Sequence, residues 1–162
     1  MNDTITDTYT ALDILFNDYK RELNEIGVMK NDKKYISIGL DFDGTVVMHN
    51  YPDIGPEIPY AVDIIKEYSD KYNVVWILNT MRTGPLLEDA VNWFMERGIE
   101  LYGINHNPKQ DEWDSSTKAY AQVYIDDSNV GCPLIASKDY RPYVNWKGID
   151  EKMRPILEYL NK

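Results

Sequence analysis

YISIGLDFDGTVV, residues 35–47, places an apolar strand directly before an acidic loop. Apolar side chains occupy every second position from residue 36 to residue 40, which is the spacing expected of a β-strand. Asp41 and Asp43 follow at once, together with a glycine and a threonine. The stretch therefore predicts a strand that ends in a polar loop.

Strands and helices alternate along the chain after this loop. Apolar runs predict strands at residues 73–80, 101–104 and 123–125. Helices are predicted at residues 57–69, 84–98 and 149–160, and the first two carry the inward-facing residues Ala61, Ile64, Ile65, Tyr68, Leu87, Ala90, Val91 and Phe94. Such alternation is typical of a parallel sheet covered on both faces. We therefore predict an α/β fold, a three-layer α/β/α sandwich with a mainly parallel, Rossmann-like sheet.

A leading amphipathic helix is predicted over residues 8–27, where apolar side chains recur in steps of four and three. Its apolar stripe consists of Leu12, Phe16, Tyr19, Leu23 and Ile26. The stripe either packs on the core of its own chain or forms a homodimer contact, and both alternatives stay open. We assign residues 1–34 to this helical extension and residues 35–162 to the catalytic core.

The composition indicates one globular domain with an acidic surface. The 162 residues include 17 Lys and Arg against 27 Asp and Glu, a net charge of -10 that disfavours binding to duplex nucleic acid. No stretch approaches the roughly 18 consecutive apolar residues of a membrane span. The N-terminus lacks the basic start and apolar run of a secretory signal, and the single cysteine, Cys132, allows no internal disulfide. We therefore expect a cytoplasmic protein that does not bind membranes.

Acidic residues and one hydroxyl are expected at the carboxyl ends of the strands, where ligands gather in parallel sheets. Asp41 and Asp43 follow the first strand, Thr80 ends the second, and Asp126 and Asp127 end a later one. Carboxylates held together away from water repel one another unless a cation joins them. A divalent cation relieves this repulsion, and Mg²⁺ suits a site that also receives phosphate oxygens better than calcium does. The structural alternatives are a turn cap for the later acidic pair and a strand-end cap for the threonine.

Four short motifs follow one another along the chain: DFDGT, Thr80 in LNTMR, Lys118, and YIDD. In this order they resemble the four motifs of the haloacid dehalogenase (HAD) superfamily, across residues 35–130. The likeness is closer to short, capless HAD-like hydrolases of bacteria and bacteriophages, through YPDIGPEIPYAVDIIK, NTMRTGPLLEDAVNWFMERGIE and YIDDSNVG. The resemblance implies a HAD-type sheet without a large cap domain, and residues 1–34 lie outside it.

The resemblance also implies a set of catalytic residues. Asp41 would attack phosphorus and form an aspartyl-phosphate, and Asp43 would act as general acid and then as general base. Thr80 and Lys118 would hold the phosphoryl oxygens, and Lys118 would also hold Asp41. By residue type alone, a lysine such as Lys118 is usually a solvated helix residue, and only its spacing to YIDD favours the catalytic role.

Mg²⁺ is the cofactor that the resemblance implies. Asp41, Asp126 and the backbone carbonyl of Asp43 would hold the ion, with Asp127 as a direct or water-mediated ligand. We therefore assign the metal site to these four residues.

Four further residues are assigned to substrate binding. Gly44 would let the loop bend and Thr45 would steady it. Arg82 either faces the substrate phosphate or forms a surface salt bridge. His49, with Tyr51, either lines the entrance or is an ordinary loop residue.

The predicted function is a Mg²⁺-dependent phosphomonoester hydrolase acting on a small phosphorylated metabolite or nucleotide. The intervals between the motifs leave no room for a sizeable cap, so an open site is expected. The alternative is a protein that binds a phosphate ligand, such as a nucleotide signal, on the same scaffold without turnover. Phosphotransfer to another acceptor would differ only in what attacks the intermediate.

Overall fold

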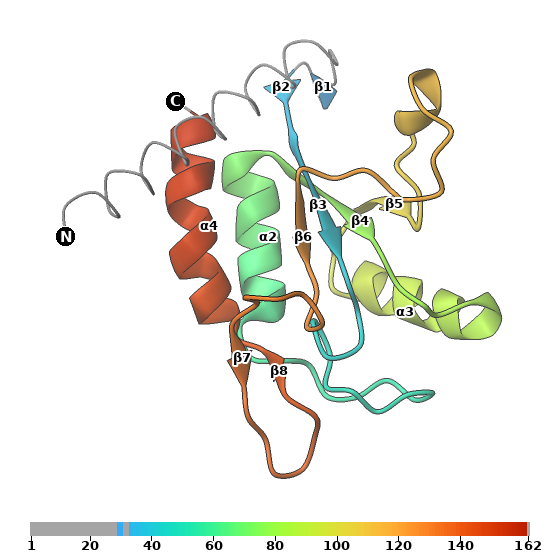
Figure 1. The fold of residues 1–162 in the computed structure, drawn as a ribbon, viewed down its shortest axis with the longest axis vertical. Helices are drawn as coiled ribbons and strands as arrows, with labels where there is room; N and C mark the ends of the chain where they lie inside the picture. Colours follow the sequence, from blue (N-terminus) through green and yellow to red (C-terminus); the bar gives the residue numbers. More distant parts are fainter. Residues whose placement is uncertain (1–28, 31–32, 162) are drawn as a thin grey trace.

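A four-stranded parallel sheet forms the centre of the protein (Figure 1). The computed structural model describes residues 29–30 and 33–161. The strands lie in the order β5, β4, β3, β6, and all neighbours are parallel. Their bounds are Ile36–Leu40 for β3, Val74–Leu78 for β4, Leu101–Ile104 for β5 and Val123–Ile125 for β6. The predicted α/β fold with a parallel sheet is confirmed.

The described helices are α2 (Ala61–Tyr72), α3 (Gly84–Glu96), α4 (Trp146–Leu160) and a single 3-10 turn, η1 (Gln110–Glu112). The apolar faces predicted for α2 and α3 are buried or packed against the main core. The prediction that α2 starts at Glu57 is wrong. The Ile58 amide donates to the Val46 carbonyl at 2.9 Å, and Tyr60 has a left-handed φ of 69°, so the helix starts only at Ala61.

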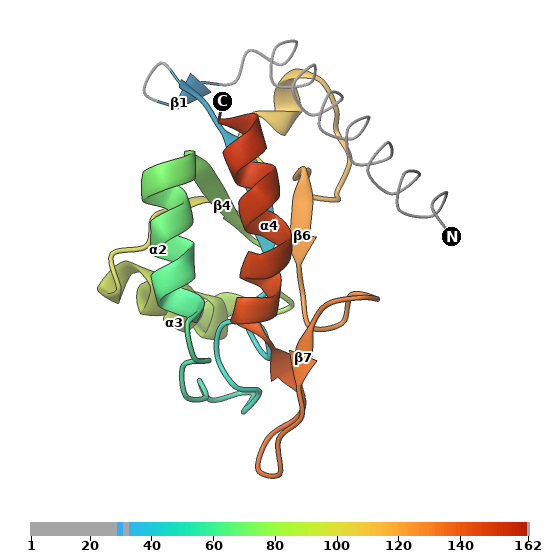
Figure 2. The ribbon, with the colours of Figure 1, turned by 90° about the vertical axis from the view of Figure 1, so that its left-hand side faces the viewer.

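The two faces of the sheet are covered differently. On one face Trp76 belongs to a core that includes buried residues of α2, α3 and α4, and Figure 2 shows α2 and α4 side by side over the sheet. On the other face Ile77 packs against Ala119 and Ala121, from residues 105–122. In the described part of the chain this face is covered by residues 105–122, a loop that contains η1, so the described residues show one helical layer of the predicted three-layer sandwich.

A short antiparallel hairpin, β7 (Leu134–Ile135) and β8 (Tyr143–Val144), precedes α4. The amide of Val144 donates to the Gly44 carbonyl at 3.0 Å, and the indole of buried Trp146 donates to the Thr45 carbonyl at 2.7 Å. These bonds attach the hairpin to the loop after β3, at the end of the sheet toward which the strands point (Figures 1 and 2). The last helix therefore starts at Trp146, earlier than the predicted Ile149.

The chain from β3 to β6, which the structure describes completely, holds only loops, α2, β4, α3, β5 and η1. No separate cap domain is inserted in this interval, as expected. Before β3 the structure describes one antiparallel pair, β1 (Met29–Lys30) and β2 (Lys33–Lys34). The helix predicted over residues 8–27 lies outside the described residues, so its two alternatives stay predictions. No helix in the described part of the chain is long and apolar enough to span a membrane.

Candidate functional site

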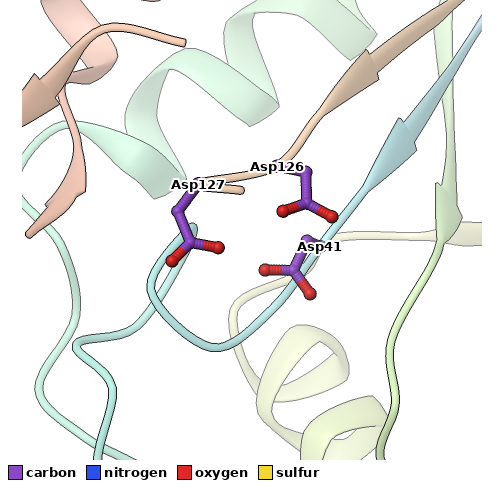
Figure 3. A group of neighbouring side chains, drawn as sticks. All are labelled: Asp41, Asp126 and Asp127. Carbon is purple, nitrogen blue, oxygen red and sulfur yellow. The ribbon is translucent and has the colours of Figure 1, made fainter. Parts of the chain in front are cut away.

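Three carboxylates converge at the carboxyl ends of β3 and β6 (Figure 3). The parallel pairing of the two strands continues past their ends, where the Asp41 amide donates to the Ile125 carbonyl at 3.0 Å. Asp126 and Asp127 follow Ile125 directly, so all three acids meet. One oxygen from each of the three carboxylates lies within 4.8 Å of the others. This arrangement matches the predicted meeting of distant acids at one sheet edge.

Thr45 connects the two acidic segments. Its hydroxyl donates to Oδ2 of Asp41 at 2.8 Å and accepts from the Asp127 amide at 3.1 Å, and its side chain is fully buried. Gly44 has a left-handed φ of 83°, and a β-carbon there would lie 2.5 Å from Oδ2 of Asp127. These contacts shape and steady the loop, but neither residue lines the cleft described below, so their assignment to substrate binding stays a prediction.

Burial and mutual repulsion disfavour the charged form of these acids. Loss of hydration raises the pKa of Asp41 to about 8; the Thr45 hydrogen bond opposes this shift, and the charges of Asp126 and Asp127 add to it. The pKa of Asp127 is also raised, first by burial and then by Asp126. Three oxygen donors that repel one another in so small a space are the donor set that a hard divalent cation such as Mg²⁺ prefers. The residues present therefore fit the predicted metal.

Asp43 is held apart from this cluster by Arg82. Both oxygens of Asp43 accept hydrogen bonds from the guanidinium, from Nε and Nη2, each at 2.7 Å. The same guanidinium donates to the carbonyls of Pro52 and Asp53, at 3.0 and 2.9 Å, and is 1% exposed. The hydrogen bond to Asp43 raises the pKa of Arg82.

These contacts bear on two predictions. The carboxylate of Asp43 is bound by Arg82 and is not one of the three clustered carboxylates, and the predicted metal ligand at this residue, its backbone carbonyl, stays a prediction. The salt bridge of Arg82 to Asp43 is buried and not at the surface, and the carboxylate and the loop at Pro52 occupy four of the five donor hydrogens of Arg82. Arg82 lines the cleft, and its contact with a substrate phosphate stays a prediction.

A cleft of about 350 Å³ opens over the carboxylates. It is lined by Asp41, Asp43, His49, Tyr51, Thr80, Met81, Arg82, Asp126, Asp127, Ser128 and Arg141. Thr80 lies at the end of β4, where its amide donates to Oδ1 of Asn105 at 2.8 Å and its hydroxyl accepts from the Arg82 amide at 3.2 Å. The structure thus brings the four predicted carboxylates together with Thr80, His49, Tyr51 and Arg82.

Lys118 does not line the cleft. It is exposed, and its ammonium lies 5.0 Å from the centre of the Tyr124 ring. The Gln110 amide donates to the carbonyls of Ser116 and Lys118, at 3.0 and 2.9 Å, and these bonds fix the backbone of the segment there. The prediction that Lys118 holds Asp41 and the phosphoryl oxygens is therefore wrong for this structure.

Sequence reasoning missed three residues of the cleft lining, Met81, Ser128 and Arg141, and of these Arg141 carries a charge. It lies between β7 and β8, 98 positions beyond Asp43. No motif surrounds it, and hairpin strands of two residues leave no periodic signal. Only a search for basic residues near the end of the chain could have suggested it.

Comparison with known proteins gives one relative with a solved structure. No protein-family model matches this chain, and no curated protein matches it. The chain is similar to a conserved protein encoded by Bacteroides thetaiotaomicron, with 35% sequence identity and a TM-score of 0.61. The match covers 75% of this chain and 92% of the other. The chain therefore belongs to the same family as this conserved Bacteroides thetaiotaomicron protein.

Proposed function

We propose that this chain is a Mg²⁺-dependent phosphomonoester hydrolase on a Rossmann-like, HAD-type sheet. The observation that carries the proposal is the convergence of Asp41, Asp126 and Asp127 at one sheet edge, with Asp43 in the same cleft. Asp41 and Asp43 stand two residues apart after a buried strand, the spacing of a nucleophile and its acid/base partner in the family that DFDGT resembles.

Asp41 is the nucleophile in this proposal. One of its oxygens attacks phosphorus, the bond from phosphorus to the leaving oxygen breaks, and an aspartyl-phosphate forms. Mg²⁺, held by Asp41, Asp126 and Asp127, would neutralise charge on the phosphoryl oxygens. Thr45 keeps Asp41 oriented through its hydrogen bond at 2.8 Å.

Asp43 transfers the protons. In the first step it gives a proton to the leaving oxygen, and in the second it takes one from the water that attacks the aspartyl-phosphate. Each carboxylate oxygen has two lone pairs, and Arg82 occupies one on each oxygen, so one lone pair per oxygen remains for this proton. Arg82 thereby fixes the orientation of Asp43 and leaves a lone pair free on each oxygen, but it also favours the charged carboxylate, so Asp43 must first take up a proton from solvent to act as the acid.

The cleft favours small substrates with an exposed leaving group. About 350 Å³ accommodates a phosphate with part of a sugar or ring. Tyr51 and Met81 lie at its opening, 55% and 95% exposed, and offer apolar surface to the leaving group. A phosphorylated metabolite or a nucleotide can place its phosphate in the cleft and leave the rest of the molecule against Tyr51 and Met81.

Phosphate release from nucleotides, sugar phosphates and aryl phosphates, with Mg²⁺ or with EDTA, tests the proposal. We expect Mg²⁺-dependent release by the wild type and by Asp70→Asn, which removes a carboxylate from an exposed position on α2. Asp41→Asn should release none. Turnover near the wild-type rate in Asp41→Asn contradicts the covalent route, and tight binding without any turnover by the wild type favours the binding-protein alternative.

A further inference from the structure

The β7–β8 hairpin brings a second basic residue, Arg141, into the cleft. Arg82, the other basic residue of the lining, is bound to Asp43 through two hydrogen bonds. Within the described part of the chain, Arg141 forms no ion pair with a carboxylate, and its side-chain contact is with His49. Its charge is thus available to a ligand.

Several bonds hold the hairpin that carries Arg141 in place. Val144 is bonded to the Gly44 carbonyl in the loop that follows Asp41. Within the hairpin, the Ser137 hydroxyl accepts from the amides of Asp139 and Tyr140, at 3.2 and 3.1 Å, and so fixes the turn just before Arg141. The residue is therefore positioned by the same loop that positions the proposed nucleophile.

His49 holds Arg141 at the cleft. Its Nε2 lies 3.3 Å from Nη1 of Arg141 and accepts a hydrogen bond from it when the imidazole is neutral. Both residues line the same cleft as Asp41, Asp126 and Asp127.

The net charge of the site explains why a free arginine in the cleft matters for binding an anion. Three carboxylates and one divalent cation carry a net charge of -1, which repels a phosphate ester. One arginine brings the cluster to neutrality, and its planar donors match phosphate or carboxylate oxygens. Lys118, which the resemblance assigns to this task, lies over Tyr124 instead.

We propose that Arg141, oriented by His49, is the residue that binds an anionic group of the substrate in this cleft. The proposal rests on the phosphatase function and adds the substrate class: an anionic ester with phosphate or carboxylate oxygens against the β7–β8 hairpin. The anionic group is either the transferred phosphoryl group or a second anion on the leaving group.

Binding of inorganic phosphate in the presence of Mg²⁺, measured by calorimetry, tests the anion contact without any turnover. Arg141→Gln should weaken binding by about tenfold to a hundredfold, the range for losing charge-assisted hydrogen bonds. The matched control is Lys138→Gln, which removes a positive charge from an exposed position of the same hairpin that does not line the cleft. The control should stay within about twofold of the wild type, and Arg141→Lys should recover part of the loss.

Kinetics with phenyl phosphate and 4-carboxyphenyl phosphate separate the two sources of the anion. An equal rise in KM for both substrates in Arg141→Gln identifies the transferred phosphoryl group. A rise for the carboxylated substrate alone, with phosphate binding unchanged, identifies a second anion. Unchanged phosphate binding and unchanged KM for both substrates, in a variant that melts like the wild type, overturns the proposal. A wild type that binds phosphate but releases none from any nucleotide, sugar phosphate or aryl phosphate tested refutes the phosphatase function, and the calorimetry still tests Arg141.

Discussion

Asp41→Asn should stabilise the protein in the absence of metal, although it removes the proposed nucleophile. The pKa of Asp41 rises from its ordinary value of 3.8 to about 8 in the folded chain. The unfolded chain therefore releases this proton first as pH rises, and the folded state becomes less stable through the window from about pH 4 to pH 8. Asparagine has nearly the same shape, still accepts from Thr45 and carries no charge, so the penalty disappears.

The size of this destabilisation follows from the difference between the pKa of Asp41 in the unfolded and in the folded chain. Each pH unit between the two values costs about 1.4 kcal/mol, so the penalty at pH 7 has an upper limit of roughly 4 kcal/mol. For a chain of this length, a gain of that size raises Tm by roughly 10 °C. At pH 4 the gain should be close to zero, because Asp41 is then protonated in the folded state.

Urea unfolding in EDTA at pH 4.5 and pH 7.5, followed by circular dichroism, measures the effect. Asp70→Asn, at an exposed position on α2, is the control and should leave the free energy of unfolding nearly unchanged at both values. Millimolar Mg²⁺ should then stabilise the wild type, by about 2.7 kcal/mol at a hundredfold excess over Kd, and Asp41→Asn much less. The reasoning is refuted if Asp41→Asn is no more stable than the wild type at pH 7.5 in EDTA, or gains equally at pH 4.5.

Four other predictions concern the metal site, the Asp43–Arg82 pair and the predicted leading helix. Asp126→Ala should abolish the rise in Tm that Mg²⁺ gives the wild type in a thermal melt; a rise of wild-type size would exclude Asp126 as a ligand. Asp43→Asn should slow hydrolysis of alkyl phosphates about 10²- to 10⁴-fold, and of p-nitrophenyl phosphate less, because nitrophenolate leaves without a proton; equal losses for both would argue against proton transfer to the leaving group. Arg82→Met should lower the free energy of unfolding by about 3–5 kcal/mol in urea titrations, because Asp43 loses its buried partner; a smaller loss than 1 kcal/mol would show that the pair is unimportant for stability. Removing residues 1–30 should convert a dimer to a monomer in light scattering if the predicted stripe forms the dimer contact; a full-length monomer, or a dimer unchanged by the truncation, excludes that alternative.

Local sequence pattern predicted the parts of the fold that depend on one segment at a time. Alternation from residue 36 to residue 40 predicted β3, and the apolar spacing of residues 61–68 predicted the buried face of α2. Both predictions are confirmed, because a strand or helix that buries one face repeats its apolar side chains at the period of that element. The predicted start of α2 is wrong because the Ile58 amide bonds to the Val46 carbonyl. This contact joins two segments, and the spacing of apolar residues within one segment gives no sign of it.

For the candidate site, too, the sequence predicted some residues correctly and others not. Asp41, Asp126 and Asp127 could be foreseen at one edge, because parallel strands place their carboxyl ends together whatever the details of the loops. Lys118 could not be placed correctly, because the path of residues 105–122 depends on hydrogen bonds from Gln110 to backbone carbonyls several residues away.

The sequence by itself determined the four strands of the central sheet, that they run parallel and that acids follow two of them. Tertiary structure alone decided where the arginine side chains lie relative to the acidic site. Arg82 reaches Asp43 across 39 residues, and Arg141 enters the cleft because Val144 bonds to Gly44 a hundred positions earlier. A side-chain contact of this kind depends on the paths of two loops at once, and the pairing rules of strands and helices do not constrain those paths.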